Sequence, residues 1–173
     1  MSTIFYLLEK LNKIIPIEKI YAHCDIPCGI YDPHDAQVSA HTVIRMIDLI
    51  KDLKAPTTDS TAHEIEEYNN KLNRCILEKE KHAEWCKHQV RILWGDYFKD
   101  DHVKNFPELH DLVWKVMQSG SKVKQSVDRE AAEELLCNVQ RIAEIFWETK
   151  GVGSIKIKSF YPTGSDIVYP KTS

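Results

Sequence analysis

Long hydrophobic runs are scarce in this chain of 173 residues. Near the N-terminus the longest apolar run is Ile4–Leu8, which is shorter than the roughly seven to fifteen apolar residues at the centre of a secretory signal. No stretch approaches the roughly 18 apolar residues that a membrane-spanning helix needs. These absences predict a cytoplasmic protein that does not bind or cross a membrane.

An excess of one charge is also lacking. The 23 lysines and arginines nearly balance the 26 aspartates and glutamates, so the net charge is −3, and no nucleic-acid binding is expected. The six glycines and seven prolines concentrate toward the two ends of the chain. The middle is therefore almost free of helix-breaking residues, and the length favours one domain with a packed core.

Through this middle region, apolar residues recur at steps of three and four, the spacing of one helix face. The pattern predicts helices over residues 34–54, 60–98, 107–120 and 128–151, with only Lys79 interrupting the apolar face of the second. Such helices with short connections favour an all-α fold, an antiparallel up-down four-helix bundle over residues 34–151. For residues 152–173 we predict a short irregular tail, or a short strand around Ile155 and Ile157.

The cysteines are odd in number and irregularly spaced, which is not typical of a secreted disulfide framework. Cys75, Cys86 and Cys137 lie within the helical patterns, where a cysteine is usually a small buried apolar residue. Cys24 and Cys28 instead follow His23 in the segment HCDIPCGIYDP, residues 23–33. This segment is the only cluster of reactive side chains that the sequence presents.

Three ordinary interpretations of Cys24 and Cys28 remain open on spacing alone. The two thiols can form a disulfide, although His23 would then have no role. They can contribute to a structural zinc site, although zinc usually takes four protein ligands and no second cysteine pair follows. One of them can be a catalytic nucleophile, although that chemistry needs a distant base and leaves the other thiol unused.

Removal of residues 1–22 creates a fourth possibility, because His23 then carries a free amine. That amine, the deprotonated backbone nitrogen of Cys24 and the thiolates of Cys24 and Cys28 are donors for a nearly planar site. Pro27 helps to turn the chain so that Cys28 closes the fourth corner. Square-planar nitrogen and sulfur donors suit Ni(II) or Cu(II) rather than zinc. The imidazole of His23 remains as an axial ligand.

Four segments together resemble the nickel-containing superoxide dismutase family. They are HCDIPCGIYDP at residues 23–33, ILWGDYFK at 92–99, PELH at 107–110 and IFWETK at 145–150. The resemblance spans His23 to Lys150, in order and at compatible spacing. It implies a leader at residues 1–22 that a processing protease removes, a nickel hook at 23–33, one nickel ion per subunit and assembly into a homohexamer. The implied reaction converts superoxide to dioxygen and hydrogen peroxide by Ni(II)/Ni(III) cycling.

The resemblance also implies roles for individual residues. His23, Cys24 and Cys28 would be the nickel ligands, and Tyr31 would stand near the open face of the site and control the access of small anions. The surroundings of the hook would be formed by Asp25, Pro27 and Gly29, with support from Tyr97.

Two positions depart from the family pattern, and residues 152–173 extend beyond it. Where the family commonly holds the axial imidazole with a glutamate and an arginine, Ser39 and His82 occupy the corresponding places, so they are expected to give a weaker support that depends on pH. These departures keep open a non-catalytic nickel- or copper-binding helical bundle as the alternative function. A third reading is an interaction bundle with a redox-labile Cys24–Cys28 disulfide.

Overall fold

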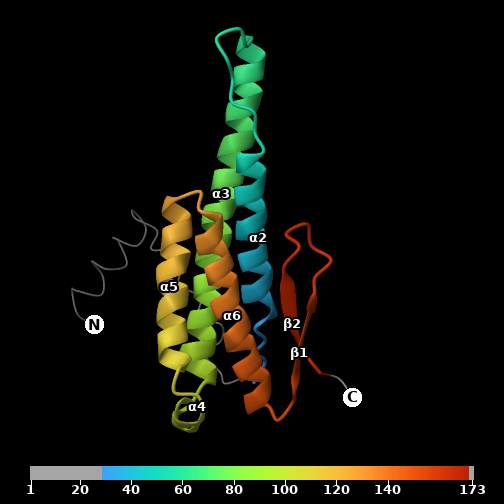
Figure 1. Cartoon of the computed structure of the whole chain (residues 1–173). Coiled ribbons are helices and arrows are strands. Elements are labelled where there is room, and N and C mark those ends of the chain that lie inside the picture. The colour runs from blue at the N-terminus through green and yellow to red at the C-terminus, as the bar shows by residue number, and fades with distance from the viewer. Residues whose placement is uncertain (1–28, 172–173) are drawn as a thin grey trace, which may run out of the picture.

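The computed structural model describes residues 29–171. The prediction of a mainly helical protein is confirmed (Figure 1). Five α-helices and one π-helical turn precede two strands. They are α2 (His34–Lys51), α3 (Ala62–Ile92), η1 (Leu93–Tyr97), α4 (Asp100–Asn105), α5 (Leu109–Gln125), α6 (Arg129–Thr149), β1 (Ser154–Lys158) and β2 (Asp166–Pro170).

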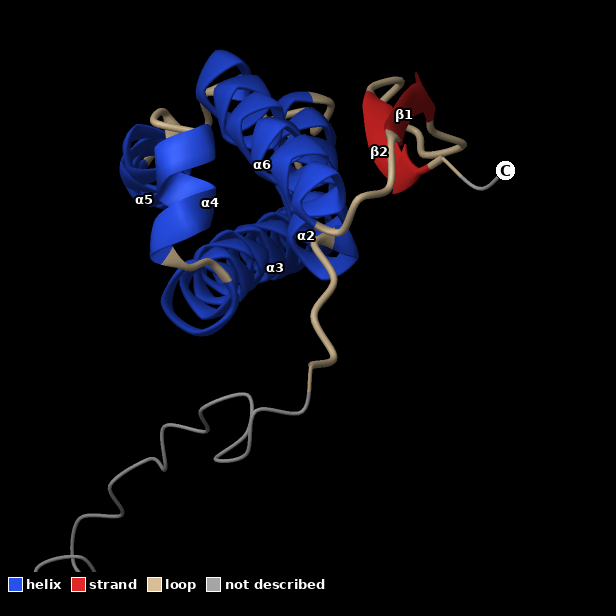
Figure 2. Ribbon diagram, turned by 90° about the horizontal axis from the view of Figure 1, so that it is seen from below, coloured by secondary structure: helices blue, strands red, loops and turns tan. Residues whose placement is uncertain are grey.

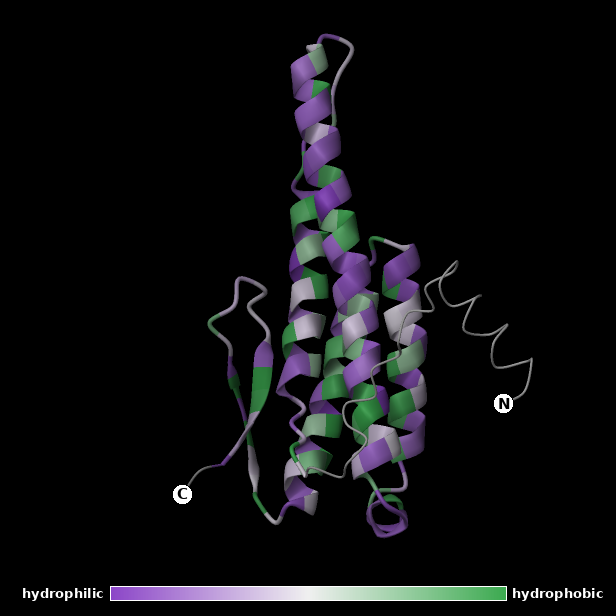
Figure 3. Cartoon of the chain, turned by 180° about the vertical axis from the view of Figure 1, so that it is seen from behind, coloured by the Kyte–Doolittle hydropathy of each residue, from purple (hydrophilic) through white to green (hydrophobic). Residues whose placement is uncertain are grey.

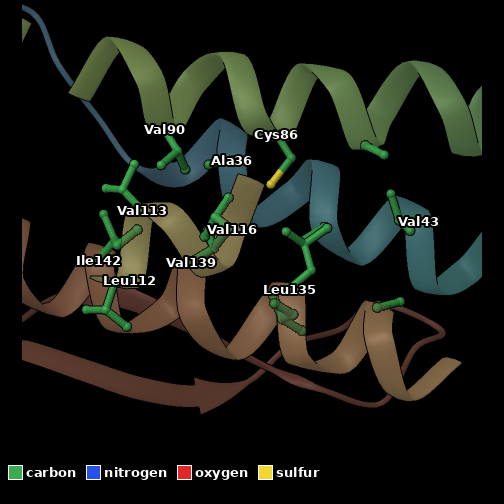
Figure 4. Close-up of a cluster of buried hydrophobic side chains, with 14 of the residues drawn as sticks. Ala36, Val43, Cys86, Val90, Leu112, Val113, Val116, Leu135, Val139 and Ile142 are labelled. Carbon is green, nitrogen blue, oxygen red and sulfur yellow. The ribbon is translucent and has the colours of Figure 1, made fainter. Parts of the chain in front are cut away.

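The long helices surround a common core. Helix α2 packs against α3 and α6, and α5 packs against the same two helices from the other side. Apolar side chains from all four helices meet between them (Figure 4). The core has the aliphatic character that the periodic pattern predicts; its largest fully buried side chains include Phe146, Ile44, Ile47, Leu109, Leu135, Ile142 and Ile145.

The two halves of α3 have different surroundings. All of its buried residues lie from Lys79 onward, and the earlier half extends beyond α5 and α6 beside the end of α2 (Figure 1). Much of this projecting half is hydrophilic (Figure 3). Its first turn is held by a capping box, in which Thr61 accepts from the backbone N–H of Glu64 and the Glu64 side chain accepts from that of Thr61.

Lys79, which interrupts the apolar pattern of α3, caps the C-terminal end of α5 with its side chain. Its side chain is only 2% exposed, and its Nζ donates to the carbonyl oxygens of Val123, Lys124 and Ser126 at 2.5, 2.8 and 3.0 Å. The last carbonyl groups of a helix have no partner within it. The lysine therefore supplies donors to the end of α5, and burial lowers its pKa.

Of the two expectations for residues 152–173, the short strand around Ile155 and Ile157 is confirmed as β1, whereas the irregular tail is wrong. Strands β1 and β2 pair in antiparallel fashion, with Ser154 opposite Pro170 and Lys158 opposite Asp166. We call residues 154–170 the C-terminal hairpin; it lies beside α2 and α6 (Figure 2). In the connection between the strands, Gly164 has a φ of 66°, a backbone conformation that favours glycine.

No helix within residues 29–171 combines the length and apolar character that crossing a membrane requires.

Candidate metal centre

The donor set predicted for nickel lies outside the described residues, as do Asp25 and Pro27. Among residues 29–171, no group of three or more histidine, cysteine, aspartate or glutamate side chains is placed to hold a metal ion. The structure describes the last residues of the predicted hook, from Gly29 to Pro33, and the helices that follow them.

Residues 29–33 are the last part of the predicted hook and lead into α2. Gly29 has a φ of 71°, so the chain turns there through a conformation that side chains disfavour. Asp32 then accepts from the backbone N–H of His34 at 2.7 Å through its Oδ1, and Pro33 is buried. These features define the start of α2, the helix that the chain enters directly after the predicted hook.

The structure brings Tyr31 and Tyr97 together. Their ring centroids are 5.5 Å apart, although Tyr31 lies near the end of the predicted hook and Tyr97 is the last residue of the π-helical turn η1. Both rings are half-buried. The hydroxyl of Tyr97 is 2.7 Å from that of Thr149 at the end of α6. Two predicted site residues therefore meet where the chain leaves the hook, and π-helical turns of this kind are frequent at functional sites.

Further residues surround Tyr97 that the sequence reasoning did not single out. The ring of His102 on α4 stacks on it with centroids 5.6 Å apart, the ring of Phe146 lies 4.6 Å away, and Lys150 places its Nζ 4.8 Å from the Tyr97 centroid. Phe146, Thr149 and Lys150 belong to IFWETK, one of the segments that carried the resemblance. The resemblance of that segment to the family could have pointed to these three residues, whereas no sequence pattern pointed to His102.

Ser39 and His82 lie on the sides of α2 and α3 that face each other. Farther along this seam, Met46 of α2 and Glu78 of α3 line one shared hollow. Ser39 is about two turns before Met46 on the same side of its helix, and His82 is about one turn after Glu78. Because the two helices run in opposite directions (Figure 1), both residues lie toward the hook end of the seam.

The polar atoms of His82 are unevenly satisfied. Its Nε2 lies 3.5 Å from Oε2 of Glu78, while its Nδ1 is buried without a hydrogen-bond partner among the described residues. Ser39 is 2% exposed. A buried ring nitrogen without a partner is uncommon in native proteins and calls for an explanation.

The three cysteines of the helices do not form a second reactive site. Cys75, Cys86 and Cys137 are free thiols. Burial raises the pKa of Cys86 to about 12, so it stays protonated and serves as a small core residue. The prediction of burial holds for Cys86, whereas Cys75 is half-buried and Cys137 is exposed.

Comparison with known proteins identifies the family of this chain. The family model for nickel-containing superoxide dismutase matches residues 18–150. The chain belongs to the nickel-containing superoxide dismutase family. The resemblance that the four sequence segments suggested is therefore confirmed, and the family match includes the predicted hook.

Relatives and solved structures agree with this membership. The chain is 37% identical over 135 residues to a nickel superoxide dismutase from Streptomyces seoulensis, covering 78% of this chain and 93% of the relative. It is 36% identical to one from Streptomyces coelicolor over the same share of each chain. A native nickel superoxide dismutase structure matches with a TM-score of 0.63 at 36% identity, covering 74% of this chain and 99% of the other. The C-terminal hairpin lies outside the residues that the family model matches.

Proposed function

We propose that this protein converts superoxide to dioxygen and hydrogen peroxide with one nickel ion per subunit, held by His23, Cys24 and Cys28. The observation that carries the proposal is the HCDIPCGIYDP donor set within a family match over residues 18–150. Membership of the family makes superoxide the substrate and nickel the cofactor.

The donor chemistry of the hook fits nickel. The amine of His23, the backbone nitrogen of Cys24 and the thiolates of Cys24 and Cys28 would hold the ion, and the imidazole of His23 would be a further ligand. Bound nickel supplies a Ni(II)/Ni(III) couple for one-electron transfer. The amine exists only after removal of residues 1–22, so we infer that a leader-processing protease is a partner and that the precursor lacks the complete donor set.

The residues around the hook restrict and order the site in this proposal. Tyr31 stands at its open face and limits access to small anions, and Tyr97 holds the Tyr31 ring through their 5.5 Å contact. The Tyr97 hydroxyl is in turn held by Thr149 at 2.7 Å. Asp25, Pro27 and Gly29 shape the turn of the hook. Restricted access also protects the two thiolates from peroxide, which oxidises exposed thiolates.

Ser39 and His82 are proposed to orient the axial imidazole of His23. The buried Nδ1 of His82 has no partner among the described residues and lies on the seam at the hook end of α2. A second hydrogen-bonding group fixes the orientation of a metal-bound imidazole and raises its basicity.

We also propose the fold and assembly that the family implies: an up-down four-helix bundle with an N-terminal hook, assembled as a homohexamer in the cytoplasm without nucleic acid or membrane. Three tryptophans support self-association because they are unusually exposed, by 45% for Trp85 and Trp94 and 62% for Trp114. Tryptophan is enriched at protein interfaces.

Native mass spectrometry of protein matured in its own host with nickel present tests the proposal. We expect a chain that begins at His23, about one nickel ion per subunit and a six-subunit particle. The matched control is Cys28→Ser, which keeps the chain length and removes one thiolate. A host-matured protein that retains residues 1–22 and carries no nickel would contradict the hook.

Superoxide consumption by the loaded protein separates catalysis from the non-catalytic nickel- or copper-binding alternative. We expect rapid consumption by the mature protein and a loss of more than about a hundredfold in Cys28→Ser, because a missing ligand costs at least as much as a missing outer partner. Nickel binding without turnover would favour the alternative.

A further inference from the structure

The C-terminal hairpin is attached to the helices by side chains that take the place of a third strand. The register, together with the bonds of Lys171 to Gly153 and of Ser159 to Ser165, directs the backbone groups of Asp166, Val168 and Pro170 away from β1. An edge strand normally leaves such groups to solvent. Here the carbonyl of Asp166 and both outward groups of Val168 meet polar side chains from α2 and α6, and Pro170 has no N–H to satisfy.

Gln37 of α2 binds Val168 in the manner of a neighbouring strand. Its Nε2 donates to the Val168 carbonyl at 3.0 Å, and its Oε1 accepts from the Val168 N–H at 2.8 Å. Because the carbonyl can only accept and the N–H can only donate, the orientation of the amide is defined. Gln37 is fully buried, so loss of its amide would leave two buried backbone groups without partners.

His41, about one turn further along α2, makes the second attachment. Its Nε2 donates to the Asp166 carbonyl at 3.0 Å, which leaves its Nδ1 to accept from the Thr163 hydroxyl at 2.8 Å. The ring also meets Tyr161 edge-on at 4.9 Å. A third contact lies at the start of the helix, where the rings of His34 and Tyr169 are 5.7 Å apart.

These contacts all fall on the first turns of α2, directly after the hook. Residues 29–33 enter the helix there, and the Gln37 backbone N–H itself bonds to the Pro33 carbonyl at 3.3 Å. We propose that the C-terminal hairpin is a positioning element, which through Gln37 and His41 holds the hook-bearing end of α2 and slows the loss of nickel from the hook. This proposal rests on the proposed nickel site.

Two measurements on the mature protein, which begins at His23, test it. The first is amide hydrogen exchange of residues 29–41 in the metal-free protein, with α5 as the internal reference. The second is the rate at which nickel passes from the loaded protein to an excess of chelator. The variants are Gln37→Leu, which removes the attachment from the helix, and Thr163→Val, which removes the His41 bond from the hairpin without changing α2. The control is Gln140→Leu, because Gln140 holds the same Asp166 carbonyl from α6 at 2.6 Å.

We expect Gln37→Leu to raise exchange in residues 29–41 and the rate of nickel loss by about tenfold each, and Thr163→Val to raise both by about threefold. Exchange in α5 should not change, and Gln140→Leu should stay within about twofold of the unsubstituted protein in both measurements. If Gln37→Leu fails to fold, Thr163→Val decides.

Unchanged exchange in residues 29–41 would overturn the positioning role, and faster exchange without faster nickel loss would overturn its connection to the metal. Failure of the unsubstituted protein to bind nickel would instead refute the proposed function, and the exchange measurement would still decide whether the hairpin holds α2.

Discussion

His41 and His82 lie on neighbouring helices, and their ring nitrogens have opposite surroundings. His41 on α2 is 3% exposed, and both of its nitrogens are hydrogen-bonded to the C-terminal hairpin. The side chain of His82 on α3 is 28% exposed, yet its Nδ1 is buried without a partner among the described residues. Both ring nitrogens of His41 have hydrogen-bond partners, whereas the Nδ1 of His82 has none among residues 29–171.

The difference separates two uses of a buried polar group. Native proteins satisfy nearly all such groups, and a satisfied group adds stability and geometric specificity. Lys79 is of the same kind as His41, because carbonyl oxygens at the end of α5 take its donors. An unsatisfied group instead calls for an explanation, and for His82 the proposed one is that it supports the imidazole of His23.

The largest effect is expected at Lys79. Lys79→Met keeps the stem of the side chain and removes the ammonium, so the carbonyl oxygens of Val123, Lys124 and Ser126 lose their donor. We expect the free energy of unfolding to fall by about 3 kcal/mol, measured by denaturant titration. Lys71→Met is the control, because Lys71 makes only an exposed pair with Glu67, and we expect a change below about 0.5 kcal/mol. An equal loss of unfolding free energy in the two variants would mean that the hydrogen bonds of Lys79 do not stabilise the fold.

A smaller loss is expected when His41 is truncated. His41→Ala leaves a cavity, deprives Thr163 of its partner and leaves the Asp166 carbonyl with Gln140 alone. We expect a loss of about 2 kcal/mol in the free energy of unfolding, measured in the same way. His63→Ala on the exposed first half of α3 is the control, with an expected change near zero. A stable His41→Ala protein would mean that the hairpin does not depend on this attachment.

The stability of the protein should also fall with acidification through His41. Burial lowers its pKa, and this outweighs the opposing effects of the Asp166 carbonyl and charge. The folded state therefore binds fewer protons at His41 than the unfolded state, so this contribution is fully present above about pH 6.5 and is lost as pH falls from there toward the lowered pKa. Unfolding titrations at about pH 8 and about pH 5.5 should give a smaller difference in His41→Ala. An identical difference would assign the pH dependence to other groups.

The smallest effect on stability is expected at His82. His82→Leu removes a nitrogen that has no partner among residues 29–171 and a long, partly exposed pair with Glu78, so the free energy of unfolding should change by less than about 0.5 kcal/mol. The spin signal of Ni(III) in the loaded protein should nevertheless shift, because the axial imidazole loses its support. His82→Arg, which introduces the residue common in the family, should keep an axial signal, and His63→Leu should change neither property. A shift in stability without a shift in the signal would make His82 a structural residue.

The positions of the helices were predictable because their periodicity is local. Apolar spacing and Gly151 act within one or two turns, and α2 and α6 follow the predicted ranges closely. Helix α5 instead continues past Gly120, its predicted end, to Gln125, and α4 was not predicted. The boundary of α3 was less accurate: the predicted helix reached residue 98, whereas the α-helix ends at Ile92 and a π-helical turn continues to Tyr97. The strand around Ile155 and Ile157 was one of two expectations, but its partner β2 was missed, because the outer edge of β2 is completed by Gln37 and His41, far away in the sequence.

The sequence by itself determined the helical character of the chain, the donor set of the hook and the segments that identify the family, because spacing and residue type carry that information. Only the tertiary structure decided which distant groups meet. It brings Tyr31 against Tyr97, places the ammonium of Lys79 at the end of α5 and attaches the hairpin to α2. It also leaves Nδ1 of His82 without a partner among residues 29–171. The physical reason is that a buried polar group is satisfied by whatever the packed helices bring within hydrogen-bond distance, and no local pattern specifies that partner.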